Sequence, residues 1–261
     1  MLRDITLGQY YPGNSWVHSL DARIKIIATI VYIVALFIVD NFYGFIISAA
    51  ALGAVIAVSK VPLRFILRGL KPVFIIIIFT FVLNLFMVKG DVIWSLGFLH
   101  ITRQGVRTAV FLGIRLVLLI IGSSMLTLTT KPISLTDGIE KLLSPMKKIG
   151  VPAHELAMMM TIALRFIPTL IEETQKIMNA QKARGADLES GGIIKRIKAL
   201  LPILIPLLIS SVRRAYELAE AMECRCYNGG IGRTKFRIMK FSARDGISVI
   251  TVLVLTAGTV V

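Results

Sequence analysis

Apolar segments nearly as long as a lipid bilayer is thick constrain this 261-residue chain more than any other feature of its sequence. A membrane-spanning helix needs about 20 mostly apolar residues, and somewhat fewer when polar ends reach back to the interface. Hydrophobic residues make up 56% of the chain, a surplus that a soluble domain cannot bury. The sequence therefore predicts an all-α polytopic membrane protein with about five transmembrane helices, in these segments: Ile24–Val39, Phe42–Val58, Val73–Val88, Thr108–Leu128 and Gly246–Val261.

Basic residues outnumber acidic residues two to one, and they lie mostly outside the apolar segments. The net charge of +15 would suggest a nucleic-acid partner in a soluble protein. In a membrane protein the same excess marks cytoplasmic loops. If the N-terminus is inside, 26 of the 30 basic residues are cytoplasmic, whereas Lys89 and Arg103 are outside. We therefore expect a multi-pass protein of the plasma membrane, with a cytoplasmic N-terminus and no nucleic-acid partner.

The chain is expected to have three parts: residues 1–130 with the first four spans, 131–245 as a cytoplasmic domain, and 246–261 as the last span. Two stretches of the cytoplasmic domain, Leu156–Ile171 and Ala199–Val212, are apolar but short, and prolines interrupt both. If both crossed the membrane, six basic residues between them would move outside and weaken the charge bias. Five spans are therefore favoured, and a seven-span or re-entrant arrangement is the alternative.

The same two stretches begin apolar and end heavily charged. Helices over His154–Arg184 and Ala199–Cys226 would be about 46 and 42 Å long. Their ends match at an offset of 41 residues, because Ala180-Gln-Lys-Ala-Arg-Gly aligns with Ala221-Met-Glu-Cys-Arg-Cys. An Arg between small residues suits insertion into a cleft that holds a carboxylate. The duplication favours two equivalent docking points for a dimeric partner; a solvated Arg stabilised by the helix dipole is the alternative.

Three further features carry weaker signals. Met158, Met159 and Met160 offer a surface that can repack against partners, or they belong to an ordinary core. The residues 135–145 predict a short amphipathic helix at the membrane surface, which Thr136 can cap, with Glu140 near its first turn. Arg115 lies within the fourth span, where we expect it to pair with backbone carbonyls or water instead of forming an ion path.

Sequence signatures of catalysis are missing. The chain has no phosphate-binding loop, no nucleophile elbow, no zinc-protease helix motif and no dinucleotide fingerprint. Its two cysteines, Cys224 and Cys226, cannot form a disulfide framework or a four-ligand zinc site. We therefore expect a protein that is not an enzyme.

The order of these features resembles one family, the transmembrane T components of energy-coupling-factor (ECF) transporters, which import vitamins and related micronutrients. The resemblance covers nearly the whole chain, and the stretch from Arg165-Phe-Ile-Pro to Ala183-Arg-Gly is its most specific part. The second Ala-Arg-Gly motif is altered, because Cys224 and Cys226 replace its Ala and Gly. The matching segments are Leu7–Gly13, Ser19–Arg23, Leu135–Val151, Ala163–Pro168 and Gln181–Gly185.

This resemblance implies a scaffold and energy transducer, with two long crossed coupling helices in its cytoplasmic domain. The helix ends would dock two ABC-type ATPase subunits, which bind ATP and Mg, while this chain binds no cofactor. Apolar parts of the helices would contact a membrane-embedded, substrate-binding S component. The implied ATPase-docking residues are Ala183, Arg184, Gly185, Cys224, Arg225 and Cys226, and the implied S-component contacts are Met158, Met159, Met160, Leu204, Leu207 and Leu208.

Two other classes of protein would require different features. A secondary transporter would need paired charges or a polar midplane site, and it would work without an ATPase partner. A membrane protease or transferase would need a metal site or an activated nucleophile, for which no residue constellation is found. The secondary transporter is the alternative.

Overall fold

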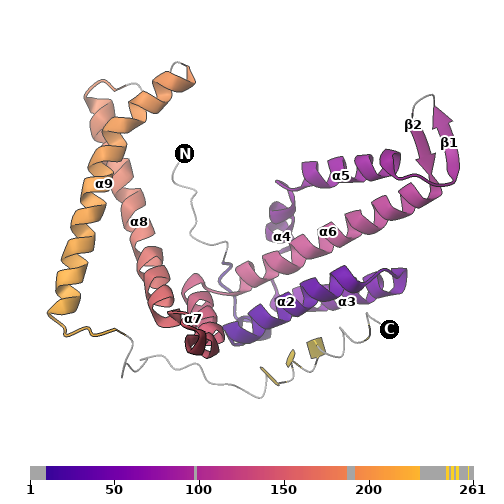
Figure 1. The fold of residues 1–261 in the computed structure, drawn as a ribbon, viewed down its shortest axis with the longest axis horizontal. Helices are drawn as coiled ribbons and strands as arrows, with labels where there is room; N and C mark the ends of the chain where they lie inside the picture. Colours follow the sequence, from indigo (N-terminus) through magenta and orange to yellow (C-terminus); the bar gives the residue numbers. More distant parts are fainter. Residues whose placement is uncertain are drawn as a thin grey trace. The chain divides into compact units, whose positions relative to one another are not determined.

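The structure is a computed structural model that describes residues 10–96, 99–186 and 192–229, together with 245–246, 248–249, 251–252 and 258. It confirms an all-α polytopic architecture, to which a short β-hairpin is added (Figure 1). The elements are α1 (Trp16–Ser19), α2 (Ala22–Ile38), α3 (Phe42–Ser59), α4 (Leu63–Leu70), α5 (Phe74–Met87), β1 (Val92–Leu96), β2 (Leu99–Thr102), α6 (Arg103–Thr129), α7 (Pro132–Leu143), η2 (Ser144–Ile149), α8 (Ala153–Ala183) and α9 (Ile193–Glu223).

The described residues divide into two compact units. We call residues 10–139, with those from Asp245 onward, the bundle, and residues 140–229 the two-helix unit. The predicted division at residues 130 and 245 stays a prediction. Parts of three predicted features lie outside the described residues: the start of Leu7–Gly13, the middle of the loop 185–192, and much of the last span.

The bundle packs α2, α3 and α4 against α6, the long central helix. Only Val39, Asp40 and Asn41 separate α2 from α3, which confirms the predicted tight helical hairpin. Apolar side chains from all four helices form one core, while many others on the same helices face outward, as lipid contact requires. The buried core residues are Leu36, Val39, Phe45, Leu52, Val61, Ile66, Leu118, Met125 and Leu128.

Three described helices, α3, α6 and α8, are long and apolar enough to cross a membrane. A fourth candidate is the pair α4 and α5, which is bent by 56° at a short break. The bend was not predicted, but the 14-residue helix α5 that follows it agrees with the predicted span Val73–Val88 to within one residue at each end. At 1.5 Å per residue it covers about 21 Å, less than the apolar core of a bilayer, which is about 30 Å thick.

Between α5 and α6 the chain forms an antiparallel hairpin of β1 and β2, in which Ser95 pairs with His100. Thr102 then begins α6, because its hydroxyl accepts a hydrogen bond from the Gly105 N–H at 3.0 Å. The same hydroxyl donates to the Val88 carbonyl at 2.7 Å and so joins the end of α5 to the start of α6.

Arg115 of α6 pairs within the protein, as expected. Its Nη2 donates to the Val39 carbonyl at 2.6 Å and to the Asp40 carboxylate at 3.1 Å, and its guanidinium lies over the Phe45 ring. The backbone partner confirms the predicted structural role. Asp40 is an additional partner, because the turn between α2 and α3 brings this loop residue beside α6.

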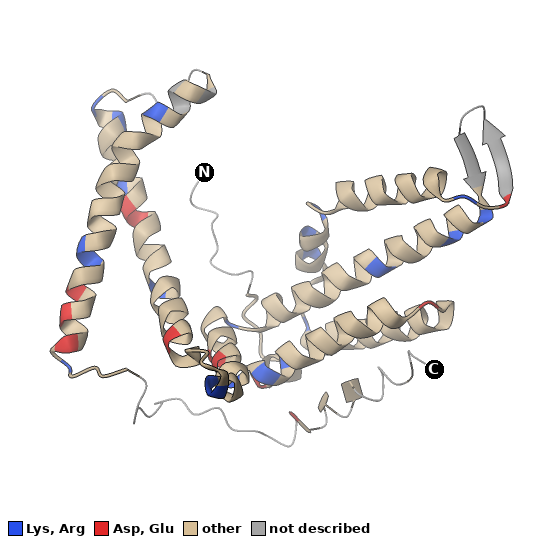
Figure 2. Ribbon diagram, in the orientation of Figure 1, with Lys and Arg blue, Asp and Glu red and all other residues tan. Residues whose placement is uncertain are grey.

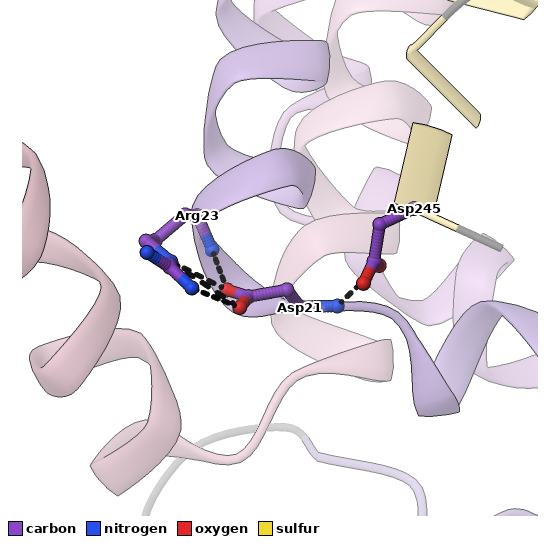
Figure 3. A network of polar contacts seen from close by, with 3 residues as sticks. All are labelled: Asp21, Arg23 and Asp245. Carbon is purple, nitrogen blue, oxygen red and sulfur yellow. Dashed lines mark hydrogen bonds and ion pairs between the residues drawn. The ribbon is translucent and has the colours of Figure 1, made fainter. Parts of the chain in front are cut away.

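A part-buried polar network joins the start of α2 to Asp245 in the C-terminal part of the bundle (Figure 3). The Asp21 backbone N–H donates to Asp245 Oδ1 at 3.0 Å, and Arg23 binds the Asp21 carboxylate through two of its nitrogens. Burial alone would raise the pKa of Asp21, but the hydrogen bonds from Arg23 outweigh that effect and hold the pKa below its ordinary value. The carboxylate therefore stays ionised at neutral pH and fixes the beginning of α2.

The start of α7 differs from the prediction. The helix begins at Pro132, a residue favoured in the first turn because it has no N–H to leave unpaired. Thr136 therefore lies inside the helix, where its hydroxyl donates to the Pro132 carbonyl at 3.1 Å instead of capping. Glu140 instead pairs with His154 Nδ1 at 3.1 Å within the two-helix unit.

Candidate docking sites at the ends of two antiparallel helices

The two-helix unit consists mainly of α8 and α9, each 31 residues and therefore about 46 Å long (Figure 1). The helix α8 agrees closely with the prediction. The second helix begins earlier than predicted, at Ile193 instead of Ala199. Figure 2 shows that acidic and basic residues gather on these helices, whereas α2, α3, α5 and α6 are almost free of charge along most of their length.

The contacts between α8 and α9 show the relative direction of the two helices, because later residues of α8 contact earlier residues of α9. The Gln181 side chain donates to the Pro202 carbonyl at 3.4 Å, and eight residues earlier on α8 the carboxylate of Glu173 binds Ser210 and Arg214 further along α9. The helices are therefore antiparallel. Pro206 lacks the N–H that would occupy the Pro202 carbonyl within a regular helix, which leaves that carbonyl open to the long contact from Gln181.

The contact between Glu173 and Arg214, at 2.8 Å, joins equivalent positions of the internal repeat. The two residues are 41 positions apart, which is the offset that aligns the helix ends. When a two-fold axis relates two copies of a repeat, equivalent residues contact each other only near that axis. The ion pair of Glu173 and Arg214 therefore marks an approximate two-fold axis between α8 and α9. Glu172 and Glu173 of the first copy correspond to Arg213 and Arg214 of the second. The side chains that meet at the axis therefore have opposite charges and attract, whereas two identical copies would bring like charges together.

The first helix end has a glycine where the backbone requires one. Gly185 follows Arg184 with a φ of 83°, a left-handed conformation in which glycine has no side-chain clash. The Gly185 N–H donates to the Lys182 carbonyl and the Ala186 N–H to the Gln181 carbonyl, both at 3.0 Å. This is the Schellman arrangement, and it ends the helix with an exposed Arg184 at its tip.

The second helix end repeats this pattern bond for bond. The Cys226 N–H donates to the Glu223 carbonyl at 2.8 Å, and the Tyr227 N–H donates to the Met222 carbonyl at 3.0 Å. Cys226 has a φ of 54°, although a side chain disfavours that conformation by about 1–2 kcal/mol. The exposed Arg225 therefore stands in the same local geometry as Arg184, despite the change from Gly to Cys.

The antiparallel pairing places the two tips on opposite sides of the central ion pair. Arg184 lies 11 residues beyond Glu173, and Arg225 lies 11 residues beyond Arg214. Each tip is therefore about 17 Å along its helix from the axis. The unit presents two equivalent Arg tips, pointing away from each other, on one pair of helices.

A cleft of about 520 Å³ adjoins the Arg225 tip, between the N-terminal part of α8 and the end of α9. Met158 and Ile162 contribute its apolar wall, while Arg225 and Asn228 contribute polar groups. The Arg225 tip therefore borders a hollow large enough for several side chains.

The structure does not bring the predicted S-component residues together. Met158, Met159 and Met160 lie near the Arg225 end of the unit, since Met158 lines the cleft beside Arg225. Leu204, Leu207 and Leu208 lie on the other side of Ser210, toward Pro202. Met159, Leu204 and Leu208 are more than half exposed, so both groups offer apolar surface that nothing in the described part of the chain covers.

Sequence reasoning missed the central contact of Glu173, Ser210 and Arg214. A signal was available, because the paired acids at 172–173 align with the paired bases at 213–214 at the same offset as the helix ends. Among the residues that the structure describes, no three His, Cys, Asp or Glu side chains are grouped for metal binding.

These observations define a class of polytopic helical membrane protein in which a long antiparallel helix pair presents two equivalent Arg tips. A family model described as cobalt transport protein matches residues 13–236. Energy-coupling factor transporter transmembrane proteins are similar over almost the whole chain. That of Clostridium kluyveri is 58% identical, covering 98% of this chain and 95% of that protein. That of Thermosediminibacter oceani is 53% identical (99% and 98%), and that of Bacillus subtilis is 44% identical (98% and 97%).

The chain therefore belongs to the family of energy-coupling factor transporter transmembrane proteins. This family and the apolar helices make it a membrane subunit of a transporter. The resemblance found in the sequence is thereby confirmed.

Proposed function

We propose that the chain is the scaffold and energy-transducing subunit of an ECF-type importer, and that it has no catalytic role of its own. It links ATP hydrolysis by two ABC-type ATPase subunits to reorientation of a membrane-embedded S component that binds a vitamin or another micronutrient. ATP and Mg are bound by the ATPase subunits. In this proposal the Arg tips of the two-helix unit bind the ATPase subunits, and its exposed apolar surfaces contact the S component.

One observation carries the proposal: Arg184 and Arg225 end their helices with the same hydrogen bonds, on opposite sides of an approximate two-fold axis. Two equivalent tips fit a partner that is itself a dimer. An exposed guanidinium can bind a carboxylate through two nitrogens, and the small residues on each side allow close approach of the partner's backbone. Each tip, Ala183 to Gly185 and Cys224 to Cys226, would occupy one ATPase subunit.

Exposed apolar side chains of α8 and α9 support contact with the S component. Leu204 and Leu208 are exposed on α9, and Met159 is exposed on α8. Such surfaces need an apolar partner or lipid. Because the two groups lie on opposite sides of the axis, the S component would contact one or both of them depending on how far it extends along the unit.

We propose a cytoplasmic location for the N-terminus and for the two-helix unit, with five spans in the plasma membrane. The charge bias supports this orientation, since nearly all basic residues are then inside. The helix α8 is apolar enough to span, but it also holds Glu172 and Glu173, and the Arg184 tip directly follows its last residue.

The test is retention of the ATPase subunits by the purified complex. Arg184→Ala and Arg225→Ala should each weaken retention, and the double variant should abolish it. Losing one partner of a buried charge pair costs about 2–5 kcal/mol, which is roughly a 30-fold or larger loss of affinity. Arg213→Ala is the matched control, because this exposed arginine lies on α9 away from the tip.

Two results would contradict the proposal. Full retention of both ATPase subunits by the double variant would refute docking through the arginines. Substrate uptake by the chain reconstituted without any ATPase would favour a secondary transporter. Cys226→Gly, which restores the residue found at the first tip, should retain the ATPases at least as well as the unmodified chain.

A further inference from the structure

The helix α4 has three distinct faces. With about 100° between successive residues, Arg64, Arg68 and Lys71 share one side, and all three are exposed. Leu63 and Leu67 share a second side and are 63% and 61% exposed. Ile66 lies on the third side, nearly opposite the basic residues, and is only 2% exposed. One short helix thus presents a basic row and an apolar row at about a right angle.

This helix is fixed to the bundle. Ile66 belongs to the apolar core, and the Phe65 ring packs on Tyr11 with 5.2 Å between ring centroids. Gly69 lies so close to α6 that an added Cβ would stand 3.1 Å from the Ser124 hydroxyl. The Arg68 guanidinium lies over the Phe65 ring at 5.6 Å. The basic row is therefore held in place by the fold.

The positive charge of this region has no counter-charge nearby in the sequence. No Asp or Glu occurs from residue 41 to residue 90, a stretch that also contains Lys60, which is exposed where α3 ends. Within the described residues, no ion pair involves Lys60, Arg64, Arg68 or Lys71. This group of four exposed cations is therefore open to anions from outside the chain.

The place of α4 in the chain indicates where those anions are. A bend of 56° separates α4 from α5, an uncharged and mostly apolar helix whose Ile75 is 76% exposed. A short helix with one exposed apolar row and one basic row, which turns sharply before an apolar helix, is typical of an element lying in the membrane interface. Leu63 and Leu67 would enter the acyl region, with the cations at the level of the headgroups.

We propose that α4 and the adjoining Lys60 and Lys71 form a binding site for anionic phospholipid headgroups. Lipid phosphates supply the missing negative charge, and their acyl chains cover Leu63 and Leu67, which a soluble anion would leave exposed. The site fixes the height of the bundle in the bilayer at the break between α3 and α5. It is independent of the ATPase-docking tips.

The test compares spin-labelled phosphatidylglycerol with spin-labelled phosphatidylcholine bound to the full chain in nanodiscs. A basic residue near an anionic surface is worth about 1 kcal/mol, or roughly fivefold in affinity. The unmodified chain should therefore prefer phosphatidylglycerol about fivefold or more. The variant Arg64→Gln/Arg68→Gln/Lys71→Gln should fall to within about twofold of no preference, while Arg64→Lys/Arg68→Lys keeps it.

The matched control is Lys89→Gln/Arg103→Gln, which removes exposed basic residues that flank the hairpin between α5 and α6. This control should keep the preference, and equal loss in control and triple variant would refute a specific site. A cooperative thermal unfolding transition is required of each variant, to establish that it is folded. Displacement of the lipid by inorganic phosphate at constant ionic strength would overturn the proposal in favour of a soluble anion. An unchanged preference in the triple variant would overturn the proposal, and loss of a partner subunit from the purified complex of that variant would then assign the basic row to an acidic protein.

Discussion

The central ion pair of the two-helix unit provides a sharp quantitative prediction. Glu173→Arg places a second cation beside Arg214, and Arg214→Glu places a second anion beside Glu173. Either change alone should weaken the pairing of α8 with α9. The double exchange, Glu173→Arg with Arg214→Glu, restores opposite charges at the same two positions and should recover most of the loss.

The expected coupling energy between Glu173 and Arg214 depends on how far solvent reaches the two side chains. Hydrogen bonds to charged groups contribute about 1.5–3 kcal/mol when they are protected, and exposed ion pairs about 0–1 kcal/mol. The Glu173 side chain is 21% exposed and the Arg214 side chain 38%, so solvent screens the pair in part. We expect a coupling of about 1–2 kcal/mol at low salt, decreasing as salt is added.

The assay is thermal unfolding of the full chain in detergent, at low and high salt. For a protein of this size, 1 kcal/mol corresponds to a shift of about 2–4 °C. The control is the same exchange at Glu172 and Arg213, which are exposed neighbours with the same charges. The reasoning is refuted if the control pair shows equal coupling, or if the double exchange at 173 and 214 is no more stable than the single variants.

Two further predictions follow from the account of α8 and α9. Ala215→Pro, between the central ion pair and the Arg225 tip, removes a helical hydrogen bond and bends α9. The complex should still assemble, but the amount of substrate taken up per ATP hydrolysed should fall in the reconstituted transporter. An unchanged ratio would contradict transmission of movement through a straight α9. A cysteine at the exposed Gly192, with Cys224 and Cys226 changed to Ser, should react with an impermeant thiol reagent only after cells are permeabilised; labelling of intact cells would favour seven spans.

Local patterns made much of the fold predictable. The apolar segments indicated α2, α3 and α6 because burial in lipid demands length and composition, which a sequence shows directly. The end of α8 was also predictable, since glycine after a helix marks the left-handed residue at Gly185. The equivalence of Arg184 and Arg225 was visible as a repeat, because the residues that set each helix end are close in sequence.

Features that depend on distant residues were not predictable in the same way. Asp40 and Arg115 are 75 positions apart, and only the packing of the α2–α3 turn against α6 brings them together. The sharp bend between α4 and α5 was not predicted either, because α4 precedes the predicted apolar span and packs against α6, which is far along the chain. The antiparallel course of α8 and α9 places the apolar end of each helix beside the charged end of the other, so the methionines and the leucines predicted to contact the S component lie on opposite sides of the central ion pair.

The central claim is that the two Arg tips move as the ends of one lever pair when ATP closes the ATPase subunits. Spin labels at Ala180 and Ala221, equivalent exposed positions one turn before the tips, report the distance between them in the reconstituted transporter. Labels at Glu172 and Arg213, beside the axis, are the control. We predict a shorter distance between the tip labels with a non-hydrolysable ATP analogue than without nucleotide, and an unchanged distance for the control. Identical tip distances in both states would contradict the account.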